Sequence, residues 1–461
     1  MRKAISLLLA CVILITAWSP LTASAAFTPT FDVVSESAYL VNTDTGKVVY
    51  EKNKDKQLDP ASLTKMMTCI IALEQIEDLE GTTATAPSYV FDELYGLNAS
   101  NAGIMVNETL TMKDLLYALM LSSACEAAGI IADYISDGNP EQFVEMMNTK
   151  AKEIGCQNTV FKNPSGLEAD GQVSTAYDMF LIASYGMSMK DGRFKEIATT
   201  QSYTMAATNK HSEPRRIVHT NFMLNMNLGG TDYFYEYVKG IKTGTSDTYR
   251  NLATSAVKDG YNYICVVMGA PIYDSYGKKY PIYTYLDTKN LYKWVFESFE
   301  YKTIANPGEK MVPNNIKVEL AKDTDALILT IKEPVVELMP SDIDVSTIMW
   351  DTSRLPETVQ APVKAGDVIG EVDLKLQGEV MQTVTVVAAE NVERSTWLYV
   401  KSIIKNVVTS WWFILIVAVL VLVVLAYIVV VVWHNKKRKH QNKVYHKNAK
   451  KRPPSRRRRK K

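Results

Sequence analysis

Leu58-Asp-Pro-Ala-Ser-Leu-Thr-Lys65-Met-Met-Thr-Cys-Ile-Ile-Ala-Leu73 predicts a buried helix with a serine and a lysine at its start. Asp59 can cap this helix and Pro60 suits its first position, so we expect the helix to begin just before Ser62. Residues three apart share a helix face, and the Lys65 amine can therefore reach the Ser62 hydroxyl. The apolar residues that follow leave Lys65 partly buried, which lowers the pKa of its ammonium. A deprotonated lysine can activate a serine without histidine.

The Ser-x-x-Lys pattern alone is a weak signal, because it also occurs at Ser255, Ser275 and Ser402. Only the predicted cap and the buried helix distinguish Ser62 from these three serines. The assignment therefore depends on what the rest of the chain places beside Ser62.

The surrounding pattern predicts an α/β fold with an antiparallel sheet. A β-hairpin is expected from Ser37–Asn42 to Lys47–Tyr50, around the turn residues Asp44-Thr45-Gly46. Caps at Thr111 and Asn139 mark helix starts. In chain order, the later expected elements are helices at 115–121, 127–135 and 140–154, strands at 238–245, 251–258 and 261–268, a helix at 282–299, and short strands at 316–320, 327–331, 368–376 and 380–387. Turns are expected at Asn163–Gly166, Asp259-Gly260 and Gln377-Gly378.

Both ends of the chain carry targeting signals. A basic start, an apolar run and the small residues Ala23-Ser24-Ala25 describe a cleavable secretory signal, with lipid attachment at Cys11 as the weaker alternative. Trp411–Trp433 has no charged residue and is long enough to span a bilayer, whereas a buried core helix is the alternative. Trp397–Thr409, just before it, is expected to be an interfacial helix.

The net charge of +1 hides an uneven distribution. Residues 434–461 hold 15 of the 51 Lys and Arg residues and no acid, and Arg2 and Lys3 lie at the other end, so the middle carries 34 basic against 50 acidic residues. The positive-inside rule places the tail in the cytoplasm and the acidic body outside. We expect the tail to lie near anionic lipid, and not to bind nucleic acid, because it lacks interleaved aromatic residues.

A further candidate motif, Gly240-Ile-Lys-Thr-Gly-Thr245, lies on the first of the later strands. A lysine and a threonine at a strand edge can hold a carboxylate, and the glycine lets a backbone approach. Between this motif and the Ser62 helix, Ser122-Ser-Ala-Cys-Glu126 is a polar break between two helical runs. The order Ser-x-x-Lys, Ser-x-x, Lys-Thr-Gly is much more specific than any one motif.

With these motifs the chain resembles the low-molecular-mass penicillin-binding proteins, and more narrowly the serine-type D-Ala-D-Ala carboxypeptidases. Ala38–Gly46, Asn163–Leu167, Ser174–Asp178 and Val267–Pro271 also carry the resemblance, which covers roughly residues 37–393. It implies a transpeptidase/β-lactamase-like α/β domain with a helical subdomain, then a small all-β domain and one C-terminal transmembrane helix. The expected divisions are a signal peptide at 1–26, a catalytic domain at 30–303, a β-rich domain at 304–394, a juxtamembrane segment at 395–410, a transmembrane helix at 411–433 and a basic cytoplasmic tail at 434–461.

The resemblance also implies a role for each motif residue. Ser62 would be the acylated nucleophile, Lys65 its general base, and Ser123 the relay of a proton to the leaving D-alanine. Lys242 would add positive charge that helps keep Lys65 neutral, and Thr243 would bind the terminal carboxylate of the substrate. The backbone amides of Ser62 and Thr245 would form the oxyanion hole. The expected substrate-binding residues are Lys242, Thr243, Gly244, Thr245 and Cys125.

Cys125 is a departure from the family pattern, which has asparagine at this position. A thiol is a weaker hydrogen-bond donor than an amide, so the loss can cost roughly 10²-fold in rate. Cys125 as a nucleophile is a further alternative that lacks an activating base. Cys69, Cys125, Cys156 and Cys265 are expected to be free core thiols.

No metal or other cofactor is expected, because His211 and His219 do not have metallopeptidase spacing. The resemblance implies a membrane-anchored bacterial carboxypeptidase that removes the terminal D-alanine of peptidoglycan stem peptides outside the cell and is acylated by β-lactams. A catalytically weak peptidoglycan-binding scaffold and a β-lactamase are the alternatives.

Overall fold

The computed structural model describes residues 29–309, 312–324 and 326–449. The predicted signal segment at 1–26 and the last part of the basic tail lie outside these residues. The chain divides into two compact units, one made of residues 1–301 and 338–343 and the other of residues 302–337 and 344–461.

A five-stranded antiparallel sheet is the centre of the first unit. Its order is β2-β1-β9-β8-β7, so strands from the start of the chain pair with strands more than 200 residues later: Leu40 of β1 lies opposite Cys265 of β9. The bounds are β1 Ser37–Asn42, β2 Val48–Lys52, β7 Lys242–Thr245, β8 Tyr249–Lys258 and β9 Tyr261–Pro271. The predicted hairpins are confirmed, and β7, with the Lys-Thr-Gly motif, is an edge strand.

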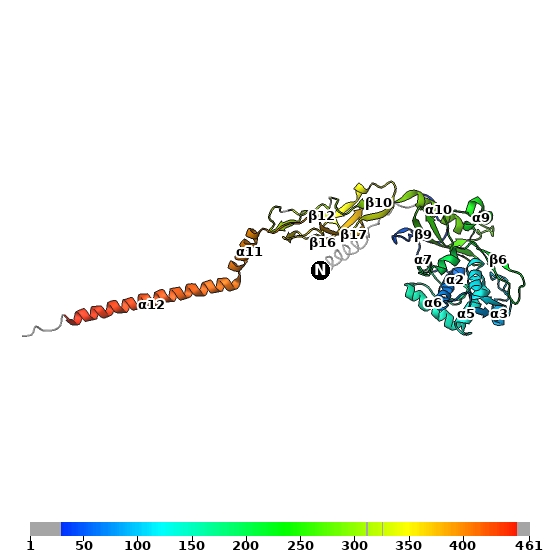
Figure 1. Cartoon of the computed structure of the whole chain (residues 1–461), viewed down its shortest axis with the longest axis horizontal. Helices are drawn as coiled ribbons and strands as arrows, with labels where there is room; N and C mark the ends of the chain where they lie inside the picture. Colours follow the sequence, from blue (N-terminus) through cyan, green and yellow to red (C-terminus); the bar gives the residue numbers. More distant parts are fainter. Residues whose placement is uncertain (1–28, 310–311, 325, 450–461) are drawn as a thin grey trace, which may run out of the picture. The chain divides into compact units, whose positions relative to one another are not determined.

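Alternate residues of the sheet pack against different helices, as the two-residue period of a strand requires. Ala38 and Leu40 of β1 belong to the core that contains α10 (Tyr283–Ser298), whereas Tyr39 and Val41 belong to the core that contains α7 (Ala176–Met187). Figure 1 shows these two helices on either side of β9. The sheet is therefore buried on both faces.

The helical part of the first unit packs around α2, Lys65–Gln75. The predicted caps are confirmed: the Thr111 hydroxyl accepts from the Asp114 amide, and the Asn139 side chain accepts from the Gln142 amide. Its other elements are β3 Thr83–Thr85, α3 Ser88–Leu94, β4 Thr109–Thr111, α4 Met112–Leu121, α5 Cys125–Ile135, α6 Pro140–Ile154, α8 Arg193–Thr199, β5 Ser202–Met205, β6 Arg215–Val218, η2 Phe222–Leu224 and α9 Met226–Tyr233.

The start of the central helix differs from the prediction. Ser62 lies on a 3₁₀ turn, η1 (Ala61–Thr64), and the α-helix begins only at Lys65. Asp59 does not cap the α-helix; its carboxylate accepts from the Ala61 amide at 2.9 Å, which stabilises the turn. The 3₁₀ turn still keeps Ser62 and Lys65 on one side, since residues three apart eclipse in that geometry.

The second unit is β-rich, as predicted. Its largest sheet has the order β12-β17-β16-β14, and β16 and β17 pair around the predicted Gln377-Gly378 turn. The sequence prediction missed β13 to β15 and the strand β10, which pairs with β13. The bounds are β10 Phe299–Ala305, β11 Lys317–Glu319, β12 Leu329–Ile331, β13 Val335–Pro340, η3 Val345–Thr347, β14 Met349–Asp351, β15 Thr358–Gln360, β16 Val368–Leu376 and β17 Glu379–Ala388.

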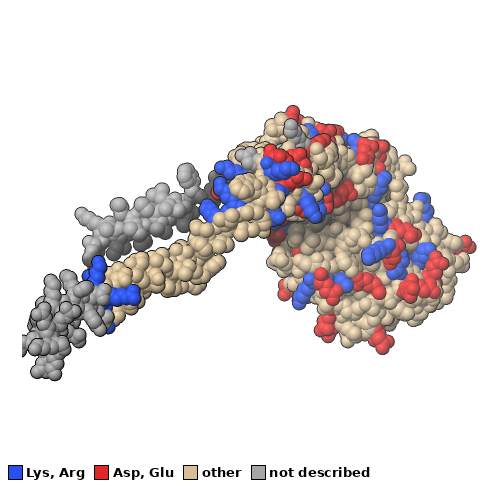
Figure 2. Space-filling view, turned by 60° about the vertical axis from the view of Figure 1, so that its left-hand side comes forward, with Lys and Arg blue, Asp and Glu red and all other residues tan. Residues whose placement is uncertain are grey.

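Two helices follow at the C-terminal end, α11 (Thr396–Val408) and α12 (Trp411–Ala449). Within the described residues, Trp411–Lys439 of α12 is the one helical segment that is long and apolar enough to cross a membrane. Figure 2 shows its apolar part as a rod without charged side chains, followed by the first basic residues of the tail.

Candidate active site

Ser62 and Lys65 are in direct contact, as the sequence predicts. The Lys65 Nζ atom lies 2.9 Å from Ser62 Oγ and also donates to the carbonyl oxygen of Ser165. Lys65 has no exposed surface. The amine is thus aimed at the serine by a fixed acceptor on its other side.

The carbonyl partner of Lys65 comes from the predicted turn at Asn163–Gly166. The Asn163 side chain accepts from the amides of Ser165 and Gly166 at 3.2 and 2.7 Å. Gly166 has φ +76°, and a Cβ atom there would lie 2.0 Å from the Ala61 carbonyl oxygen. Only glycine fits this close approach. The turn was predicted, but its role as a partner of Lys65 was not.

A second serine-lysine pair faces the first. The Lys242 Nζ atom donates to Ser123 Oγ and to the Thr243 carbonyl oxygen, both at 2.9 Å. Lys242 is fully buried on β7, and Ser123 lies in the break between α4 and α5. Residues 119 positions apart are thereby brought together.

Burial sets the protonation of both lysines. Loss of water around Lys65 lowers the pKa of its ammonium, against an opposing effect of Cys125 and Glu126. Burial, and then the charge of Lys65, hold the pKa of Lys242 well below its ordinary value. Because two charges in one buried site repel, one of the two amines loses its proton readily. A neutral amine next to Ser62 can accept the hydroxyl proton.

Cys125 contacts Lys65. Its Sγ atom lies 3.4 Å from Lys65 Nζ, and the residue is buried. The prediction of free thiols is confirmed for the four cysteines of the described residues, but Cys125 belongs to the site and not to the core. Burial raises the pKa of the other three thiols, Cys69, Cys156 and Cys265, which is typical of unreactive cysteines.

A cavity of about 350 Å³ opens above these residues. The predicted residues that line it are Ser62, Ser123, Thr243, Gly244 and Thr245. Lys65, Lys242 and Cys125 lie behind this lining. Further lining residues had no motif to reveal them, among them Ser100, Arg250 and Lys279. The lining contains no acidic residue, so the cavity suits an anionic group such as a carboxylate.

The two histidines of the body occupy different places. His219 is buried and contacts the Ile241 carbonyl oxygen at 3.2 Å. His211 lies beside Gly103 and Glu108. Among the described residues, no group of three or more His, Cys, Asp or Glu side chains is placed to hold a metal ion.

Comparison with known proteins gives two family matches. Residues 22–272 match the family model described as D-alanyl-D-alanine carboxypeptidase, and residues 299–394 match that of the C-terminal domain of penicillin-binding protein 5. The chain is similar to the D-alanyl-D-alanine carboxypeptidase DacF of Bacillus subtilis, with 30% identity over 380 residues that cover 82% of this chain and 90% of the relative.

Solved structures of penicillin-binding proteins and related enzymes also align with this chain. Penicillin binding protein 5 from Haemophilus influenzae aligns with a TM-score of 0.57 and 25% identity, over 80% of this chain and 100% of that one. The Streptomyces K15 DD-transpeptidase aligns with a TM-score of 0.51 and 27% identity, over 59% of this chain and 100% of that one. Solved variants of that transpeptidase replace a serine and, two positions later, a cysteine. Ser123 and Cys125 have the same spacing.

Proposed function

The chain belongs to the D-alanyl-D-alanine carboxypeptidase family, and on this premise we propose that it removes the terminal D-alanine of peptidoglycan stem peptides through an acyl-enzyme on Ser62. The observation that carries the assignment is the buried Lys65 amine, 2.9 Å from the Ser62 hydroxyl at the base of the cavity. The comparisons give no support to the alternative of a catalytically weak scaffold.

In the proposed reaction, Ser62 Oγ attacks the carbonyl carbon of the last peptide bond while the neutral Lys65 amine takes its proton. The backbone amides of Ser62 and Thr245 stabilise the oxyanion. Ser123, bonded to Lys242, passes a proton to the nitrogen of the leaving D-alanine. Thr243 and the cationic lining bind the terminal carboxylate, and water then hydrolyses the ester.

The C-terminal apolar helix anchors the chain in the membrane, with the catalytic body outside. We propose that α12 crosses the bilayer once and that the basic tail lies in the cytoplasm, near anionic lipid, because Lys and Arg collect on the inner side of a membrane. The predicted domain boundaries at 30–303 and 304–394 remain a proposal, as does the absence of a nucleic-acid partner.

Labelling with a fluorescent penicillin tests the nucleophile. The wild-type chain and Ser402→Ala, a control at another Ser-x-x-Lys sequence, should form a covalent adduct, and Ser62→Ala should form none. D-alanine release from a pentapeptide ending in D-Ala-D-Ala, measured by mass spectrometry, tests the reaction. An adduct on Ser62→Ala would exclude Ser62 as the nucleophile, and a wild type that releases no D-alanine would refute the carboxypeptidase.

The serine-to-cysteine spacing shared with a DD-transpeptidase favours a second candidate, transfer of the acyl group to an amine in place of water. Isotope-labelled D-alanine added to the reaction distinguishes the two. Label in the full-length pentapeptide would show transfer, and unlabelled tetrapeptide alone would show hydrolysis.

A further inference from the structure

The segment 99–105, here called the wall, carries Ser100, a cavity-lining residue that the reaction above does not use. Ser100 lines the cavity beside Ser62 and Ser123 and is exposed. Within the described part of the chain its hydroxyl makes no hydrogen bond. An unused hydroxyl in a substrate cavity is available to an amide of a bound peptide, since it can both donate and accept.

This wall is irregular in secondary structure but is tied to the second motif by its backbone. The Cys125 amide donates to the Ser100 carbonyl oxygen at 2.8 Å. Glu126, the next residue, accepts at Oε1 from the Ala102 amide at 2.7 Å and the Ile104 amide at 3.5 Å. Glu126 is only 2% exposed, and its other oxygen has no partner among the described residues. A single carboxylate oxygen therefore fixes the middle of the wall.

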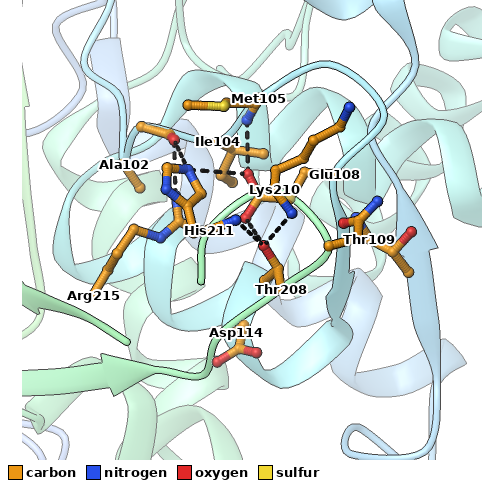
Figure 3. Close-up of polar contacts among 12 residues, drawn as sticks. Ala102, Ile104, Met105, Glu108, Thr109, Asp114, Thr208, Lys210, His211 and Arg215 are labelled. Atoms are coloured by element: carbon orange, nitrogen blue, oxygen red, sulfur yellow. Dashed lines mark hydrogen bonds and ion pairs between the residues drawn. The ribbon is translucent and has the colours of Figure 1, made fainter. Parts of the chain in front are cut away.

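A second buried carboxylate fixes the far end of the wall, as Figure 3 shows. Glu108 accepts from the Met105 amide at 2.8 Å and pairs with Arg215, which also donates to the Gly103 carbonyl oxygen at 2.8 Å. Thr208 bonds the same carboxylate at 2.8 Å. Because Glu108 has no exposed surface, water does not compete for these bonds.

These contacts hold a loop in place before substrate arrives. Binding to a mobile loop costs ordering entropy, whereas a loop with its backbone groups already bonded presents its side chain at no further cost. The contacts thus fix the backbone of the wall, and the side chain that this backbone presents to the cavity is that of Ser100.

We propose that Ser100 is a substrate-binding residue that hydrogen-bonds an amide of the stem peptide, and that Glu126 is the positioning residue that places it. The inference rests on the proposed function for the identity of the peptide. It assigns Glu126 a role through its acceptor oxygen and not through its charge, so an amide at this position should serve.

The test separates peptide binding from turnover. A fluorescein-labelled pentapeptide ending in D-Ala-D-Ala is titrated into the detergent-solubilised full chain that carries Ser62→Ala, and Kd is read from fluorescence anisotropy. Adding Ser100→Ala should raise Kd about 5-fold, the effect of one net hydrogen bond. Ser88→Ala, at an exposed serine that does not line the cavity, should leave Kd unchanged. Glu126→Ala should raise Kd roughly 10-fold or more, and Glu126→Gln should stay within about 2-fold of the parent.

Each outcome decides the proposal. An unchanged Kd in Ser100→Ala, or no binding by the parent, overturns the contact. Equal losses in Glu126→Gln and Glu126→Ala overturn positioning by the acceptor oxygen. Thermal melting of each variant checks that the chain is folded. Covalent penicillin labelling of the same variants with Ser62 restored checks that the site is intact. Failure of the proposed function appears separately, as absence of D-alanine release by the wild type.

Discussion

His219 should make the folded chain sensitive to acid. Its ring accepts from the Asn221 amide at Nδ1, at 3.0 Å, and donates from Nε2 to the Ile241 carbonyl oxygen. A neutral ring satisfies both bonds, whereas a proton on Nδ1 would break the first. Burial, and then the nearby charge of Lys242, lower the pKa of His219 to about 4 from 6.5.

The size of the effect follows from this shift. Between pH 6.5 and 4 the unfolded chain binds a proton at this position and the folded chain does not, so the free energy of unfolding falls as the pH falls. Each pKa unit is worth about 1.4 kcal/mol, which gives a total loss of about 3 kcal/mol, with about 2 kcal/mol already lost at pH 5. For a domain of this size, 2 kcal/mol lowers Tm by roughly 4–8 °C.

The assay compares the wild type with His219→Gln, whose amide can still donate and accept but does not titrate. The detergent-solubilised full chain is heated at a series of pH values between 7.5 and 4.5. Tm of the catalytic domain is the temperature at which half of the penicillin labelling is lost. Other groups titrate alike in both proteins, so the difference between their pH profiles isolates His219. Parallel profiles would refute the reasoning.

Three further outcomes are expected. The kcat/KM for D-alanine release should rise with pH and level off below 10.5, because burial lowers the pKa of Lys65; a pH profile that still rises at 10.5 would contradict this. Cys125→Asn should change the rate of D-alanine release by less than about 10-fold, because the thiol already contacts Lys65; a 100-fold gain would show an impaired enzyme. Gly166→Ala should abolish penicillin labelling and lower Tm, since its Cβ meets the Ala61 carbonyl; normal labelling would refute the close approach.

The sheet was predictable because local signals agreed along the chain. The Asp259-Gly260 turn and the alternating residues of β8 and β9 gave the strand positions within a few residues. The pairing of β1 with β9 was not predicted, since no local pattern joins residues so far apart. β14 and β15 were missed because they are three-residue strands outside apolar or alternating runs of the length that indicated β11 and β12.

Some residues of the site were predictable from motifs and others were not. Ser62, Lys65, Ser123 and Lys242 stand in recognisable motifs, and the structure brings them together. The contacts of Ser100 and Glu126 could not be predicted from the sequence. They involve backbone groups of a loop that has no sequence signature. Such contacts belong to the folded chain alone.

The position at which α2 begins also affects the chemistry. If the α-helix began before Ser62, Lys65 would lie one turn inside it. Instead Lys65 is its first residue, at the end where the peptide dipoles add up to about half a positive charge. That field disfavours a protonated amine, and it also favours the negative charge that develops on the substrate oxygen near the preceding turn. In the proposed reaction, one helix end would thus both favour the neutral Lys65 base and stabilise the oxyanion.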